Sequence, residues 1–116
     1  MDHKNLEAWK QAMILVEQVY KATTRFPEQE TYGLTSQMRR AAVSVPSNLS
    51  EGAARNGNRE YINFLGISLG SLAELETQAI IVSRLGYMDT KELLNSINEV
   101  RALLVGLRNH LRTGIS

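Results

Sequence analysis

The sequence contains no cysteine, and this absence excludes several kinds of chemistry at once. Disulfide bonds, thiolate nucleophiles and cysteine-ligated metal sites cannot form. A chain without cysteine also suits a reducing compartment, so the expected location is the cytoplasm. Histidine is almost as scarce: His3 and His110 lie near opposite ends of the chain, and neither completes the Glu-x-x-His pattern of di-iron bundles. We therefore predict no metal ion and no other cofactor.

Neither sign of charge is in excess, because 13 Lys and Arg residues face 12 Asp and Glu residues, for a formal net charge of +1. Bulk charge therefore favours neither nucleic acid nor a membrane surface as a partner, and only a local cluster of charges can. Long hydrophobic runs are also absent, since no window approaches about 18 uninterrupted apolar residues and the N-terminal segment is polar. We expect no membrane-spanning segment, no signal peptide and a single domain over residues 1–116.

Proline occupies only two positions, which leaves long stretches of the chain free to form helices. Apolar residues recur at spacings of three and four in four segments. These segments predict helices over about residues 5–25, from between Pro27 and Leu34 to about Arg55, over about 59–85 and over about 89–112. No run of alternating β-branched residues competes with this pattern. Four helices with short connections predict an all-α fold, an antiparallel up-down-up-down four-helix bundle.

The second predicted helix contains the most informative segment, residues 37–55, which reads QMRRAAVSVPSNLSEGAAR. On a helical wheel of about 100° per residue its apolar residues share one face, and a polar stripe that includes Arg40 and Glu51 lines the opposite face. Two organised faces predict a subunit contact, so we expect a homo-oligomer and not a monomer. Pro46 lacks a backbone donor and predicts either a kink in this helix or a break in which Ser44 caps a new helix.

Another polar position, Glu76, falls near the centre of the apolar face of the third predicted helix. It is either a buried carboxylate with a partner or a residue at a subunit contact, and a structural ion pair with an arginine is favoured over a catalytic role. The residues that we assign to a subunit contact or to structural polar bonds are Arg40, Ser44, Ser47, Asn48, Glu51 and Glu76.

Three patterns that resemble catalytic or cofactor sites fail on geometry. Glu74 and Glu76 point about 160° apart on a helix, so they cannot act as a paired acid and base. Gly66 and Gly70 lie within a helical pattern without a preceding strand or a following Lys-Ser or Lys-Thr, so they form no phosphate loop. No arginine stands four to six residues from His110, the spacing used by helical ribonucleases of the HEPN class. We predict no catalytic residue and therefore no enzyme.

Local positive charge remains in two regions of the chain. Basic residues outnumber acidic ones between residues 39 and 60, and the last sixteen residues contain three arginines and no acid. These regions predict contact with RNA or DNA, and their arginines are Arg39, Arg40, Arg55, Arg59, Arg101, Arg108 and Arg112. The alternative is that the charges only form a solvated face or complement a helix dipole.

Four segments of the chain together resemble a known protein family. They read LEAWK at residues 6–10, FP at 26–27 with ETYGLTSQ at 30–37, RRAAVSVPSNLSEG at 39–52, and GSL at 70–72 with ELE at 74–76. On these segments the chain resembles the four-helix-bundle proteins that are encoded in intervening sequences of bacterial 23S ribosomal RNA genes.

That resemblance implies an antiparallel four-helix bundle that assembles as a ring, typically a homopentamer, without known catalytic activity. A related branch, the accessory variability determinant of diversity-generating retroelements, implies a basic surface that binds nucleic acid and a reverse transcriptase. We therefore expect a non-enzymatic oligomer associated with RNA or with an RNA-processing partner. The alternative is a structural adaptor whose partner is another protein.

Overall fold

The structure is a computed structural model that describes residues 2–114. Its helices are the short 3-10 helices η1 (His3–Asn5) and η2 (Glu28–Glu30) and the long α-helices α1 (Glu7–Thr23), α2 (Leu34–Ala53), α3 (Asn58–Arg84) and α4 (Lys91–Thr113). Residues 2–114 contain no strand. The predicted all-α fold with four long helices is therefore confirmed.

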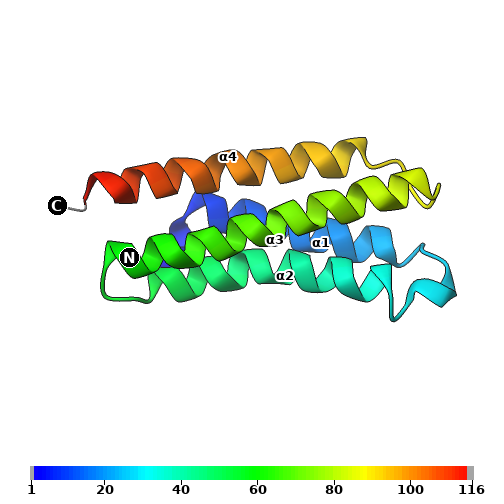
Figure 1. Ribbon diagram of the computed structural model, residues 1–116, viewed down its shortest axis with the longest axis horizontal. Coiled ribbons are helices and arrows are strands. Elements are labelled where there is room, and N and C mark those ends of the chain that lie inside the picture. The colour runs from blue at the N-terminus through cyan, green and yellow to red at the C-terminus, as the bar shows by residue number, and fades with distance from the viewer. Residues whose placement is uncertain (1, 115–116) are drawn as a thin grey trace.

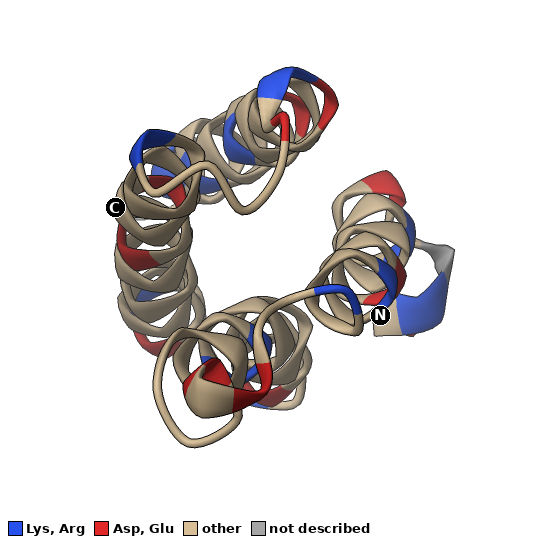
Figure 2. Ribbon diagram, turned by 90° about the vertical axis from the view of Figure 1, so that its right-hand side faces the viewer, with Lys and Arg blue, Asp and Glu red and all other residues tan. Residues whose placement is uncertain are grey.

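Figure 1 shows how the four long helices pack. Each helix lies beside the one before it and returns along the long axis, so the α1–α2 and α3–α4 connections share one end of the molecule and the α2–α3 turn lies at the other. α2 contacts α1 and α3, α4 contacts α3 and α1, and the contact between α2 and α3 is the most extensive. Viewed from the end in Figure 2, the helices surround a common core.

The core is apolar and takes side chains from all four helices. Its largest fully buried side chains are Leu15, Met38, Leu49, Leu65, Leu72, Leu75, Ile97 and Leu104. Each such side chain contributes about 1.5–3 kcal/mol through burial. Because the apolar periodicity of every helix points into this one core, the polar side chains are left on the outside and at the two ends.

The seam between α2 and α3 depends on a glycine at the end nearest their connecting turn. A Cβ atom at Gly52 would lie 2.9 Å from Tyr61 Cδ1, 3.0 Å from Phe64 Cβ and 3.2 Å from the Tyr61 carbonyl oxygen. Any side chain larger than hydrogen would therefore push the two helices apart.

Serines continue the same seam toward the middle of the helices. The Ser68 hydroxyl donates to the Val45 carbonyl oxygen at 2.9 Å, and the Ser71 hydroxyl donates to the Ser44 hydroxyl at 2.8 Å. Small side chains allow the backbones to approach, and the hydrogen bonds satisfy hydroxyls that would otherwise be costly to bury. The α2–α3 pair is thus held by both shape and hydrogen bonding.

Pro46 lies inside α2 without interrupting it. The helix runs from Leu34 to Ala53 as one element. Of the two alternatives predicted at Pro46, a kink or a break capped by Ser44, the break is therefore excluded. Two side chains donate to carbonyl oxygens beside the proline: the Asn48 amide to Ser44 O at 2.9 Å and the Ser50 hydroxyl to Pro46 O at 2.9 Å. A kink at Pro46 stays a prediction.

At the end that carries the α1–α2 and α3–α4 connections, the Glu30 carboxylate links the two connections through hydrogen bonds. Glu30 Oε2 accepts a hydrogen bond from the Tyr87 hydroxyl at 2.8 Å, and Glu30 Oε1 accepts from the Leu34 amide at 3.3 Å. Tyr87 also packs against Phe26 with ring centroids 5.6 Å apart. Gly86 follows the C-cap residue of α3 with φ of +78°, a left-handed conformation that glycine adopts readily at the end of a helix. The Glu30 carboxylate therefore joins the start of α2 to the α3–α4 connection.

The seam generates a prediction for Gly52→Ala. Alanine has a higher helix propensity, yet its methyl group would meet Tyr61 and Phe64, so we expect the free energy of unfolding to fall by about 1–3 kcal/mol. Gly106→Ala is the matched control: Gly106 lies within α4, no atom lies within 4 Å of its Cβ position, and the change should stabilise by about 0.5–1 kcal/mol. Denaturant melts of both variants measure the difference, and equal stabilisation by both changes would contradict a tight seam.

Tyr87 generates a prediction about pH. The hydrogen bond to Glu30 raises the pKa of Tyr87 above its ordinary value, and burial adds to the rise. A raised pKa means that the contribution to stability is complete below the ordinary tyrosine pKa of about 10 and is lost as pH rises through the higher folded value. Tyr87→Phe should therefore melt at a lower temperature than wild type near pH 7, and the difference in melting temperature between the two proteins should shrink at alkaline pH. A difference in melting temperature that stays constant to pH 11 would argue against this hydrogen bond.

Candidate nucleic-acid interface

The α2–α3 turn and the C-terminal end of α4 lie side by side at one end of the bundle (Figure 1). The Asn58 amide at the start of α3 donates to the Leu111 carbonyl oxygen in the last turn of α4 at 3.1 Å. This bond joins residues that are far apart in the sequence. It also brings together the arginines that flank both of its partners.

Four of the seven arginines predicted to contact nucleic acid lie at this end of the bundle, and we call this region the arginine end: Arg55, Arg59, Arg108 and Arg112. Arg55, Arg59 and Arg112 are exposed. Arg59 and Arg112 form no ion pair with any residue from 2 to 114. Two of the four guanidinium groups are therefore exposed and outside any ion pair of the described residues.

Arg55 has neighbours that hold it at the arginine end. Its guanidinium lies over the Phe64 ring, 4.8 Å from the centroid, and 3.9 Å from the Glu51 carboxylate. The Arg55 and Glu51 side chains are 47% and 59% exposed, so water screens this ion pair and it neutralises Arg55 only weakly. The aromatic ring orients the guanidinium and leaves much of its charge available to an anion.

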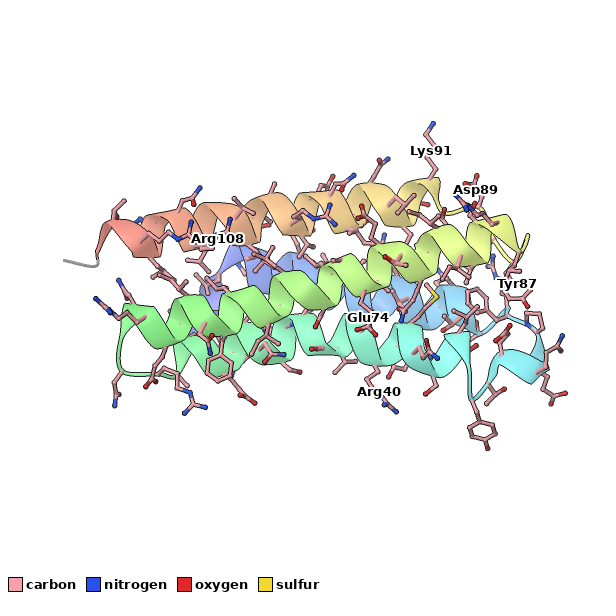
Figure 3. All side chains as sticks on the ribbon, in the orientation of Figure 1. Arg40, Glu74, Tyr87, Asp89, Lys91 and Arg108 are labelled. Atoms are coloured by element: carbon pink, nitrogen blue, oxygen red, sulfur yellow. The ribbon has the colours of Figure 1, made fainter. Side chains whose placement is uncertain are left out.

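Arg108 projects from α4 and is partly buried (Figure 3). Its Nε atom is buried and has no hydrogen-bond partner within the described part of the chain. Arg108 and Arg112 lie near the C-terminus of α4, where the helix dipole favours positive charge. The dipole therefore explains why arginines are tolerated here, while the unpaired Nε leaves hydrogen-bonding capacity unused.

The other three predicted arginines lie away from this end. Arg39 donates to the Thr23 hydroxyl at 2.8 Å and stacks on the Tyr20 ring at 4.6 Å, so it joins α2 to α1. Arg101 lies 3.2 Å from the Glu76 carboxylate. Arg40 is exposed near the middle of the bundle (Figure 3). Arg39 and Arg101 thus already have partners within the chain.

Glu76 forms an ion pair with an arginine, the pairing favoured from the sequence, and Arg101 is that arginine. The Glu76 and Arg101 side chains are 36% and 32% exposed, so the pair lies at the surface between α3 and α4, and the burial expected for a partnered Glu76 was wrong. Such a pair contributes at most about 1 kcal/mol.

The polar stripe predicted on α2 divides into two parts in the structure. Ser44 and Asn48 bond to each other and, through Ser44, to Ser71 of α3. They are therefore structural polar residues of the seam. Ser47 and Glu51 are exposed, as is Arg40, and a subunit contact through these three stays a prediction.

Three residues that shape these sites have roles that sequence reasoning missed. Gly57 holds the N-cap position of α3, and the side chain of the next residue, Asn58, reaches α4. Ser68 and Ser71 were not singled out. Helical periodicity places both serines on one side of α3, but it does not show which helix that side faces.

The titratable residues other than the arginines also bear on the chemistry that residues 2–114 can support. No group of three or more His, Asp or Glu side chains within residues 2–114 is placed to hold a metal ion. Burial raises the pKa of Tyr61, whose hydroxyl has no hydrogen-bond partner among the described residues. At the opposite end of the bundle, the ribbon in Figure 2 carries both basic and acidic positions. The acids of η2 and of the α3–α4 connection with the first turn of α4 are Glu28, Glu30, Asp89 and Glu92.

Comparison with known proteins supports the fold and the family. A solved structure from Bacteroides thetaiotaomicron VPI-5482, a protein of unknown function from the S23 ribosomal protein family, is similar with a TM-score of 0.78 and 20% sequence identity. The similarity covers 87% of this chain and 97% of that one, and at this identity it shows the fold alone. No curated protein matches the chain. The model of the 23S rRNA-intervening sequence protein family matches residues 4–106, and the chain therefore belongs to this family.

Proposed function

We propose that the protein is a non-enzymatic RNA-associated protein that contacts the phosphate backbone through its arginine end. The observation that carries this proposal is the convergence of Arg55, Arg59, Arg108 and Arg112 from two distant parts of the chain. The description of the family, which refers to 23S rRNA, supports RNA as the nucleic acid.

The arginine end suits backbone contact better than base recognition. Guanidinium groups bind phosphate oxygens through paired N–H donors, and such contacts position a protein without reading sequence. The arginines come from a turn and from a helix end, so no helix presents a row of side chains to a groove. We therefore expect weak binding, little sequence preference and a strong dependence on salt.

The proposal predicts the effect of removing the exposed arginines. The triple variant Arg55→Ala, Arg59→Ala, Arg112→Ala should bind duplex RNA more weakly at about 50 mM salt. The slope of log affinity against log salt should fall by about 2–3, because each lost phosphate contact removes about 0.7–0.9. Fluorescence anisotropy with labelled duplex and single-stranded RNA at about 50 and 200 mM salt measures both quantities.

A matched control comes from the opposite end of the bundle. The triple variant Lys21→Ala, Arg25→Ala, Arg84→Ala removes the same number of exposed positive charges and should keep the wild-type slope. Equal loss in both triple variants would show that only net charge matters and would refute the arginine end as the site. Absence of binding by wild type at the lower salt would refute RNA association and favour the protein-adaptor alternative.

A further inference from the structure

Arg55 differs from the other exposed arginines of the arginine end because an aromatic ring lies against its guanidinium group. The Arg55 Cζ atom lies 4.8 Å from the centroid of the Phe64 ring. Within residues 2–114, neither Arg59 nor Arg112 has such a contact. A guanidinium group is planar, so its faces stack on aromatic rings while its N–H donors point outward in the plane. Arg55 therefore has a geometry that the other two exposed arginines lack.

The Phe64 side chain is held in place by the tight seam between α2 and α3. A Cβ atom at Gly52 would lie 3.0 Å from Phe64 Cβ, so Phe64 starts directly against the backbone of α2, three residues before Arg55. Phe64 is partly buried, whereas the Arg55 side chain is 47% exposed. The Glu51 carboxylate, 3.9 Å from Arg55 Nη2, adds a second contact. The guanidinium group is thus supported by the seam and still open to solvent.

The chain that follows Arg55 leaves room for a flat ligand. Asn56 and Gly57 continue the α2–α3 turn, and both are exposed. No atom lies within 4 Å of a Cβ position at Gly57. A ligand can therefore approach the turn closely beside the Arg55 side chain.

We propose that the Arg55 guanidinium group, supported by Phe64, stacks on an unpaired nucleobase, so that the arginine end prefers single-stranded loops of RNA to duplex RNA. Unpaired bases stack on guanidinium planes, whereas the bases of a duplex are stacked on one another and cannot reach Arg55. Every base has a π face, so the contact does not read the identity of the base. The inference rests on the proposed function and narrows its ligand from RNA to unpaired RNA.

Stacking and phosphate contact lead to opposite expectations for duplex RNA. A duplex has a higher charge density than a single strand, so a site that used phosphate contacts alone would bind duplex at least as tightly. Arg59 and Arg112, which form no ion pair with any described residue, supply phosphate contacts in either case. A stacked Arg55 can also donate to a phosphate through its in-plane N–H groups. A preference for unpaired bases therefore distinguishes stacking from charge alone.

The test compares two RNA hairpins that carry the same number of phosphates. Their stems are identical and their loops are of equal length, but one loop carries adenine bases and the other is abasic. Fluorescence anisotropy with the purified full chain at about 50 mM salt measures both affinities. Wild type should bind the adenine hairpin at least about fivefold more tightly, which is the lower end of the effect of one stacked base. Arg55→Lys keeps the charge but lacks a planar group, so it should bind both hairpins equally.

Two further variants show whether the effect belongs to the Arg55–Phe64 pair. In Arg59→Lys, the matched control at an exposed arginine without an aromatic contact, both affinities can fall, yet their ratio should stay at the wild-type value. Phe64→Leu keeps an apolar side chain but removes the ring, so it should lower the preference for the adenine loop.

The outcomes separate this inference from the proposed function. Equal binding of both hairpins by wild type, or a wild-type preference in Arg55→Lys, would overturn stacking and leave RNA association intact. Absence of binding to either hairpin would instead refute the proposed function, and the stacking contact with it.

Discussion

The close approach of α2 and α3 is the constraint on which the rest of the structure depends. Gly52 lets the Tyr61 ring and backbone lie against α2, and the Ser68 and Ser71 hydroxyls bond across the same seam. This contact sets the position of the turn between the two helices. The turn carries Arg55 and leads into Arg59, so the geometry of half the arginine end follows from the packing of small residues.

The part of the arginine end that lies on α4, with Arg108 and Arg112, is positioned by the side-chain amide of Asn58. Asn58 reaches across to the last turn of α4 and holds that turn, which carries Arg112, against the start of α3, which carries Arg59. The remaining basic side chains are used differently: Arg39 holds α2 to α1, and Arg101 pairs with Glu76. The same residue type thus has a structural role in the body of the bundle and is left free at its end.

Most of the fold, and only part of the site, was predictable from the sequence. The spacing of apolar residues predicted four helices within a few residues of their ends, because helical periodicity is a local property of the sequence. The reach of Asn58 to Leu111 was not predictable, since it depends on which helix lies alongside. The continuity of α2 through Pro46 was not settled by the sequence, because a proline inside a helix allows either a kink or a break. The polar stripe on α2 was visible on a helical wheel, yet the pairing of Ser44 with Ser71 required the partner helix.

The most direct test of the account is a nuclear magnetic resonance titration that follows the Nε–H signals of the arginines as duplex RNA is added. These signals report on each guanidinium group separately. We expect Arg55, Arg59, Arg108 and Arg112 to shift, and Arg39 and Arg101 to stay in place because they are engaged within the chain. Shifts confined to Arg84 or Arg40, or no shift at the arginine end, would contradict the assignment of RNA contact to this end.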